Sequence, residues 1–394
     1  NVGDDEHFKI ISESGGTMNG TTNRDRTNYF ETIPSNQLET ALWLEADRMG
    51  FLLDAVTVEK FENQRDAVKN EKMQNQINRP YGMFWEIKDQ TLYPEGHPYS
   101  WPTIGYVDDL DRVTVDDLKD FFMRWYGPNN AYLVVAGDVK TEDVIALSKK
   151  YFGSIPRGQE VRDLRVPRVN LPQNKYRKFA DRIYFPMAAF VYPTVGNHHK
   201  DEAALDALSD MMGGGNNSLF YKEFVKTEKA VQASVSHPCS ELSGEFLIQI
   251  ISYPEYTFAE TEEKINSLIN NFEEYITDEA LERFKSTMRS DIIDGLSSVA
   301  GKASQLTSWS YLLDEPHNFS KEIERYEAVT KEDVLKVYFK YIKNKKSVGI
   351  DYFPLPPFSE DSVQSINPYA HVPYKKDAQY EGLTYTKPTD SFDR

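Results

Sequence analysis

The sequence contains two copies of one pattern, separated by more than half the length of the chain, and this repeat constrains the fold more than any other feature. The stretch VTVDDLKDFF begins at Val113, and a similar stretch, VTKEDVLKVY, begins at Val329. Likewise, TVEKFENQRDAVKNE begins at Thr57 and TDEALERFKSTMRSD begins at Thr277, with nearly the same spacing. This spacing is far longer than a solenoid unit, so we expect two copies of one domain.

Local patterns predict helices and strands in both copies. Apolar residues at helical spacing, often after a capping residue, indicate helices, and short β-branched or aromatic runs indicate strands. The predicted helices cover 34–49, 57–76, 114–126, 141–152, 200–212, 218–229, 259–275, 277–292 and 330–342. The predicted strands are a hairpin within 17–32 and the runs 131–136, 183–192, 231–236, 245–252 and 347–352.

Proline, glycine and charged residues mark the boundary between the copies. They are concentrated in residues 156–175, where large apolar residues are few, so this segment is predicted to be a linker. The first domain would then occupy residues 1–155 and the second residues 176–352. The tail, residues 353–394, is rich in Pro, Ser and Tyr without periodicity, and we expect it to be a linker toward a further half.

The repeat also predicts that the first copy is incomplete. At the spacing of the two copies, Asn1 corresponds to a position near Phe220, yet the second copy already has a predicted strand and helix in residues 176–217. The first copy has no equivalent of them, and the chain does not begin with Met. We therefore expect about forty residues of the first copy, including a helix equivalent to 200–212, to lie upstream of Asn1.

Charge and cysteine content exclude several classes of protein. The net charge of −17 and the absence of a basic tract argue against a nucleic-acid partner. No run of about 18 apolar residues is present, so no membrane span is expected. The single cysteine, Cys239, excludes an internal disulfide framework and a cysteine-rich zinc site. Cys239 lies beside His237 in the sequence, and we interpret it as a lone, semi-buried thiol.

The predicted helix 57–76 carries a carboxylate where an apolar residue would be expected. Phe61, Gln64, Val68 and Glu71 follow one another at helical spacing, so they share one stripe of this helix. If that stripe faces inward, burying Glu71 is costly unless a partner group compensates its charge. The helix alone favours a partly buried ion pair or a frayed helix end, and the alternative is a metal ligand.

Five stretches of the chain resemble the M16 family of zinc peptidases, the pitrilysin or insulinase family, in its bacterial two-half branch. They are GGTMNGTTNRDRTNYF, FENQRDAVKNE, GHPYSWPTIG, WYGPNNAYLVVAGDV and SLFYKEFVKTEKAVQASVS, so the resemblance spans both copies, about residues 1–352. It implies an α+β fold of two repeated domains, each a mixed β-sheet with helices packed on one face, the LuxS/MPP-like metallohydrolase fold. It also implies a zinc-dependent endopeptidase that hydrolyses unfolded peptides or small proteins through zinc-activated water.

The family holds zinc through His-x-x-Glu-His on one helix and a third ligand, a glutamate, far downstream. By this resemblance the third ligand is Glu71. The two histidines and the general-base glutamate would lie on the helix that the repeat places upstream of Asn1. Glu6 and His7 do not supply the motif, because its first position would then be Gly3.

Three departures from the family pattern have consequences for the site. Gln64 stands seven residues before Glu71, where the family often has a second-shell glutamate, and an amide brings no charge to tune the metal. The Arg and Tyr that the family contributes from its non-metal half correspond to Val225 and Gln232, so a second M16 half, in the same polypeptide or a partner subunit, would supply them. Asp291 takes the place of the ligand in the second copy without any histidine pair, so that copy is expected to be inactive.

Asn19 and Gly20 correspond to the positions at which the family holds the substrate backbone beside the metal by strand addition. The polar, Thr-rich run 17–28 fits an exposed sheet edge, and a plain solvated hairpin fits it nearly as well. The resemblance implies one zinc ion in the intact protein and a peptide substrate. Residues 1–394 alone are expected to be inactive, because a single carboxylate does not hold catalytic zinc.

Two other functions stay open at this point. A non-catalytic M16 homologue that acts as a peptide-binding or structural subunit is favoured by Gln64 and disfavoured by Glu71. A carbohydrate- or cell-surface-binding module has only the aromatic content, 13% of residues, in its favour. The compartment is equally open: the family branch suggests the bacterial periplasm or cell envelope, and the cytoplasm is the alternative.

Overall fold

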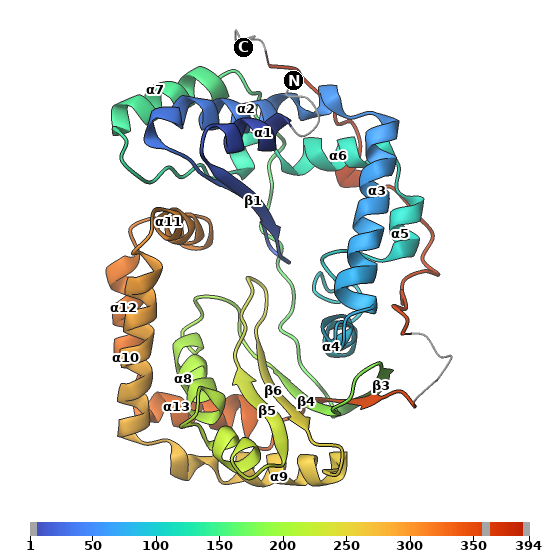
Figure 1. Ribbon diagram of the computed structural model, residues 1–394, viewed down its shortest axis with the longest axis vertical. Coiled ribbons are helices and arrows are strands. Elements are labelled where there is room, and N and C mark those ends of the chain that lie inside the picture. Colours follow the sequence, from blue (N-terminus) through green and yellow to red (C-terminus); the bar gives the residue numbers. More distant parts are fainter. Residues whose placement is uncertain (1–5, 357–362, 389–394) are drawn as a thin grey trace.

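The computed structural model describes residues 6–356 and 363–388, which form two lobes joined by long extended segments (Figure 1). The upper lobe in Figure 1 holds α1 (Glu6–Glu13), β1 (Thr17–Thr22), β2 (Thr27–Thr32), α2 (Leu38–Ala55), α3 (Val58–Lys72), α5 (Val107–Arg112), α6 (Val115–Trp125) and α7 (Thr141–Phe152). The helix α4 (Phe84–Leu92) lies lower, beside the sheet of the other lobe. The lower lobe holds β3 (Lys175–Asp181), β4 (Met187–Pro193), α8 (Glu202–Gly213), β5 (Ala230–Ser236), β6 (Glu245–Ser252), α9 (Phe258–Asn270), α10 (Asp278–Gly295), α11 (Val299–Leu313), α12 (Phe319–Glu327), α13 (Lys331–Val337) and β7 (Val348–Pro354).

The second domain is built on a five-stranded mixed sheet with the order β3-β7-β4-β6-β5. The pair β3–β7 is parallel, and the other pairs are antiparallel. Six of the seven residues of β4 are buried, which requires cover on both faces of the sheet. This arrangement confirms the mixed sheet. Four of its five strands, β4 to β7, were predicted within about four residues of their observed bounds, whereas β3 was not predicted.

The helices of the second domain itself pack on one face of this sheet, as expected, and the first copy covers the other face. One face packs into a core with α8, α9, α10 and α13, in which Phe220 and Phe246 are fully buried. The other face packs against α4 and residues 93–99, which belong to the first copy in sequence. The apolar side chains of β4 point alternately to both faces, and each face has to bury its own set.

In the first domain, the run 131–136 is not a strand, contrary to prediction. Tyr132 and Leu133 are about half exposed, at 53% and 49%. A strand needs a neighbour that pairs with its backbone, and in the described residues of this domain the hairpin β1–β2 pairs only with itself. The apolar composition of 131–136 therefore has no sheet to join here.

Equivalent helices of the two copies begin with the same caps. The side chains of Thr57 and Thr277 accept hydrogen bonds from the third residue of α3 and α10. Thr114 and Thr330 form reciprocal capping boxes at the starts of α6 and α13. The helices that the sequence relates thus share their caps, and the repeat itself stays a prediction. The helices α11 and α12, by contrast, were not predicted, and in the described part of the chain no helix combines the length and hydropathy that crossing a membrane requires.

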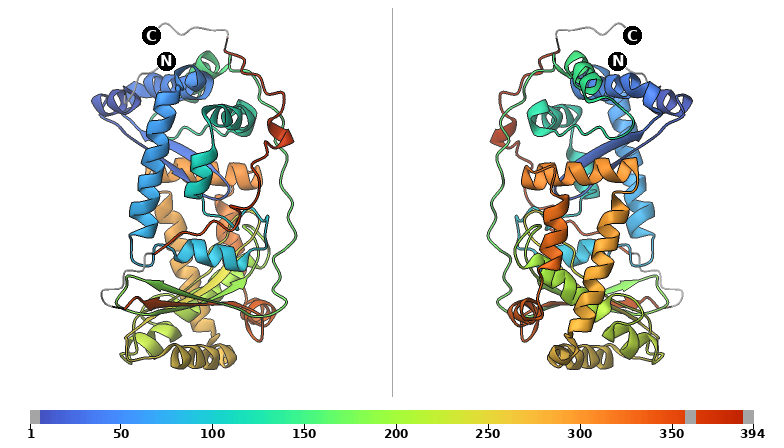
Figure 2. Two further views of the ribbon diagram at one scale, coloured as in Figure 1. Left: turned by 90° about the vertical axis from the view of Figure 1, so that its right-hand side faces the viewer. Right: turned by 90° about the vertical axis from the view of Figure 1, so that its left-hand side faces the viewer.

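The C-terminal segment 363–388 returns from the second domain and lies along the first (Figure 2). The indole of Trp125 donates a hydrogen bond to the Tyr380 hydroxyl at 3.1 Å, and the Tyr385 hydroxyl donates one to the Gly50 carbonyl at 2.9 Å. The extended linker near 154–174 runs along the same side of the molecule. Both connections therefore join the two lobes, and the C-terminal segment forms hydrogen bonds with the first domain along its course.

Candidate functional site

The helix α3 presents a different stripe to its neighbours from the one that the sequence suggested. The inward side chains are Phe61, Arg65, Val68 and Lys72, whereas Gln64 and Glu71 are exposed on the flank. Arg65 donates to the Val113 carbonyl, and its guanidinium lies over the Phe61 ring. The prediction that Glu71 is on the inward stripe was therefore wrong, because long basic side chains with partners took the inward positions.

Lys72, immediately after Glu71, fixes the end of α3. Its side chain is fully buried, and its Nζ donates to Glu86 Oε2 of α4 at 2.9 Å and to the Gly105 carbonyl at 2.7 Å. The backbone then continues as a π-helical turn, Met73–Ile77, a rare geometry that is frequent at functional sites. This anchoring holds the exposed carboxylate of Glu71 on a rigid support.

The residues of this chain supply only part of the ligand set of a zinc site. Glu71 offers an accessible carboxylate, and Gln64 lies two turns before it on the same flank. The printed sequence has no His-x-x-Glu-His, so the histidines of such a site are not among these residues. Within residues 6–356 and 363–388, the one group of three potential ligands does not include Glu71. One carboxylate alone is too few donors for a zinc site.

Asn19 and Gly20 lie on β1, whose outer edge is unpaired among the described residues. Both are exposed, and they pair with Phe30 and Tyr29 across the hairpin. The Asn19 side chain accepts a hydrogen bond from the Gly20 amide at 2.8 Å. The exposed edge required for strand addition is thus present, although a plain hairpin would have one as well.

The turn of this hairpin is held by a buried charge network that sequence reasoning missed. Arg24 donates to both oxygens of Asp89 on α4, at 2.6 Å each, and to Glu245 Oε1 on β6 at 3.0 Å. Lys88 also donates to both carboxylates, and the Tyr93 hydroxyl donates to Glu245 at 2.7 Å. Two cations balance two anions, so the network joins the hairpin, α4 and the second domain.

The environment of Glu245 keeps it ionised. Burial by itself would raise the pKa of this carboxyl, but Lys88 and Arg24 outweigh burial and lower it. The sequence does carry a signal for this network, since Lys88 and Asp89 interrupt the apolar residues Phe84, Ile87 and Leu92 of α4. Their partners lie far away along the chain and could not have been identified from that signal.

The remaining residues considered in the sequence do not form a catalytic site. Asp291 and Gln232 are exposed, and Val225 packs against the core. Cys239 is partly buried, as expected, and its Sγ lies 3.6 Å from His237 Nε2. Burial raises the pKa of this thiol, which disfavours the thiolate that a nucleophile requires.

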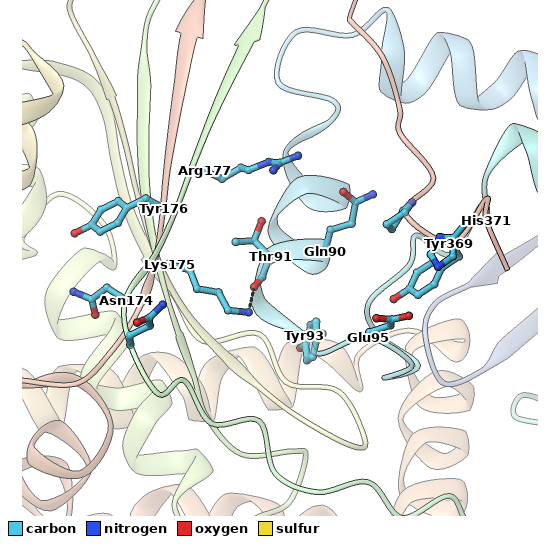
Figure 3. A pocket seen from close by; sticks show the side chains of 12 residues that line it. Gln90, Thr91, Tyr93, Glu95, Asn174, Lys175, Tyr176, Arg177, Tyr369 and His371 are labelled. Carbon is cyan, nitrogen blue, oxygen red and sulfur yellow. Dashed lines mark hydrogen bonds between the residues drawn. The ribbon is translucent and has the colours of Figure 1, made fainter.

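A polar cavity of about 600 Å³ lies between α4, the start of β3 and the C-terminal segment (Figure 3). Lys175 donates to the Thr91 carbonyl at 2.7 Å on one wall, and Tyr369 and His371 lie on the other. None of Glu71, Gln64, Asn19 and Gly20 lines it. The cavity is therefore separate from the candidate site.

Comparison with known proteins shows which proteins this chain is similar to. Residues 112–288 match the family profile described as the peptidase M16 inactive domain. The chain is 29% identical over 353 residues to the zinc protease PqqE of Helicobacter pylori, covering 88% of this chain and 78% of that protein. It is 23% identical over 332 residues to an uncharacterized zinc protease of Mycobacterium tuberculosis, covering 81% of this chain and 73% of that one.

Solved structures share the fold. A protease from Helicobacter pylori superposes with a TM-score of 0.81 at 27% identity, covering 90% of this chain and 85% of that one. The first half of the periplasmic protease PqqL from Escherichia coli superposes with a TM-score of 0.69 at 15% identity, covering 89% of this chain and 78% of that one. This arrangement of helices and mixed sheet is therefore that of M16-like peptidases. The chain is therefore similar to M16 zinc proteases, and its residues 112–288 match the family model described as the peptidase M16 inactive domain.

Proposed function

We propose that the intact protein is a zinc-dependent metalloendopeptidase of the M16 type, which hydrolyses peptide bonds of unfolded peptides or small proteins. Homology to proteins named zinc proteases supports this proposal. The observation that carries it is the exposed carboxylate of Glu71 on α3, held by the buried Lys72–Glu86 pair beside it. Glu71 would be the third zinc ligand, and residues 1–394 alone would be inactive, because they contain no His-x-x-Glu-His.

The proposed roles follow from the positions of the side chains. Bound zinc would polarise the peptide carbonyl and activate a water molecule. Glu71 contributes one charged ligand atom, and Gln64 can hydrogen-bond a ligand but adds no charge. Asn19 and Gly20, on the unpaired edge of β1, would hold the extended substrate backbone by strand addition.

A second M16 half, in the same polypeptide or a partner subunit, would complete the active site. Val225 and Gln232 stand where the family has its Arg and Tyr, so this chain does not supply that pair. One solved structure is described as the first half of the protease PqqL, and this chain covers 42% of the chain in the structure described as PqqL itself. That protein is described as periplasmic, and we propose a bacterial envelope location for this one.

A non-catalytic, peptide-binding M16 subunit is the alternative. It is favoured by Gln64 and by the match of residues 112–288 to a domain described as inactive. It would use the same β1 edge without metal. The two functions differ in whether zinc binding depends on Glu71.

Zinc content and cleavage of an internally quenched, unstructured peptide test the proposal in the intact protein. Glu71→Gln should lose both zinc and cleavage, whereas Asp291→Asn, the equivalent exposed position of the second copy, should keep both. Equal zinc in the wild type and Glu71→Gln would remove Glu71 from the ligands. Peptide binding without cleavage or zinc in the wild type would establish the alternative.

A further inference from the structure

Three potential metal ligands from three elements meet at the base of the β1–β2 hairpin. They are His7 on α1, Glu31 on β2 and Glu45 on α2, and one ligand atom of each lies within 4.8 Å of the others. His7 Nε2 is 2.7 Å from Glu31 Oε1 and 3.9 Å from Glu45 Oε1. This group lies apart from α3 and does not include Glu71.

An ion pair with His7 does not account for the burial of the whole Glu31 carboxylate. Its side chain is only 6% exposed, and His7 satisfies a single oxygen, Oε1. The other oxygen, Oε2, is buried and has no hydrogen-bond partner in the part of the chain that the structure describes. An unpaired buried carboxylate oxygen is costly, and a bound cation would compensate it.

The surroundings hold the third ligand in place. Arg48, one turn after Glu45 on α2, donates to its carboxylate, and the Arg48 guanidinium lies 3.7 Å from the centre of the Tyr29 ring. Arg48 thereby orients Glu45, whose Oε1 accepts from Arg48 Nε at 3.3 Å and lies 3.9 Å from His7 Nε2. One imidazole and two carboxylates are a donor set typical of zinc-class divalent cations.

We propose that His7, Glu31 and Glu45 bind a divalent transition-metal ion that is distinct from the proposed catalytic zinc. Its role is structural, because it joins α1 and α2 to the strand that pairs with β1. Glu31 lies opposite Met18 in the hairpin, next to the position of Asn19. The ion would therefore steady the strand edge proposed to hold substrate.

Zinc titration of the 394-residue chain, by calorimetry and by the shift in melting temperature, tests this site. We expect one equivalent of zinc to bind the wild type and to raise its melting temperature. His7→Ala and Glu31→Gln should weaken binding at least tenfold and abolish the shift. Glu13→Gln, at an exposed position on the same helix as His7, should bind as the wild type does.

Two further variants separate this proposal from its competitors. Glu71→Gln should leave this equivalent unchanged, so the site can fail or hold independently of the proposed peptidase function. Glu45→Gln repeats the test if Glu31→Gln does not fold, as judged by circular dichroism. No binding to the wild type, or equal binding to the wild type and the folded ligand variants, would overturn the proposal.

Discussion

Replacing Lys72 by methionine tests whether the buried pair at the end of α3 supports the candidate ligand beside it. The Lys72 and Glu86 side chains are 0% and 2% exposed, so the substitution leaves a buried carboxylate without its cation. Removing one partner of a buried ion pair costs about 3–5 kcal/mol. The Gly105 carbonyl also loses its donor, whereas Glu86 Oε1 keeps its bond from Ser365.

Urea denaturation followed by tryptophan fluorescence and circular dichroism would measure this loss. In a thermal melt, at roughly 2–4 °C for each kcal/mol lost, the melting temperature should fall by roughly 6–20 °C. The matched control is Lys69→Met, one turn earlier, where Lys69 forms a solvent-exposed pair with Asp111 at 2.8 Å. That change should cost far less, because water solvates both charges.

The double variant Lys72→Met with Glu86→Gln sharpens this test. It removes both charges, so it should be more stable than Lys72→Met alone, and the difference measures the coupling of the pair. If Lys72→Met costs no more than Lys69→Met, the reasoning from burial is refuted. If the double variant costs the sum of the two single variants, the pair is not coupled.

Two further predictions concern the second domain. Lys88 and Arg24 lower the pKa of Glu245 from its ordinary 4.5, so the ionised Glu245 stabilises the fold fully above about pH 4.5. This stabilisation is lost as the pH falls through the lowered pKa. In acid unfolding followed by circular dichroism, the stability of Glu245→Gln should therefore fall less with decreasing pH than that of the exposed control Glu255→Gln. Gly213→Ala would place a Cβ 2.2 Å from the Val235 amide nitrogen, so urea denaturation should show a loss of at least about 1–3 kcal/mol in the free energy of unfolding. The control Gly295→Ala, whose Cβ would meet only a side-chain atom at 3.6 Å, should leave this free energy unchanged.

Local chemistry was sufficient to predict most elements of this protein. The caps at Thr57, Thr114, Thr277 and Thr330 act within one turn of helix, so the residues that form them are neighbours in sequence. Strands such as β6 were predicted because their apolar runs are short and β-branched. The run 131–136 has the same character but is not a strand, because pairing depends on a neighbour that local composition does not specify.

The sequence is enough to identify the helix that carries Glu71, but only the packing of that helix shows which way it faces. Spacing alone admits more than one inward stripe, and the choice fell to Lys72, whose partners Glu86 and Gly105 lie 14 and 33 residues further along the chain. Only the fold brings His7 to Glu31 and Glu45, or Arg24 to Glu245 across 221 residues. Charge compensation in a protein interior depends on distance in space, and chain order does not encode that distance.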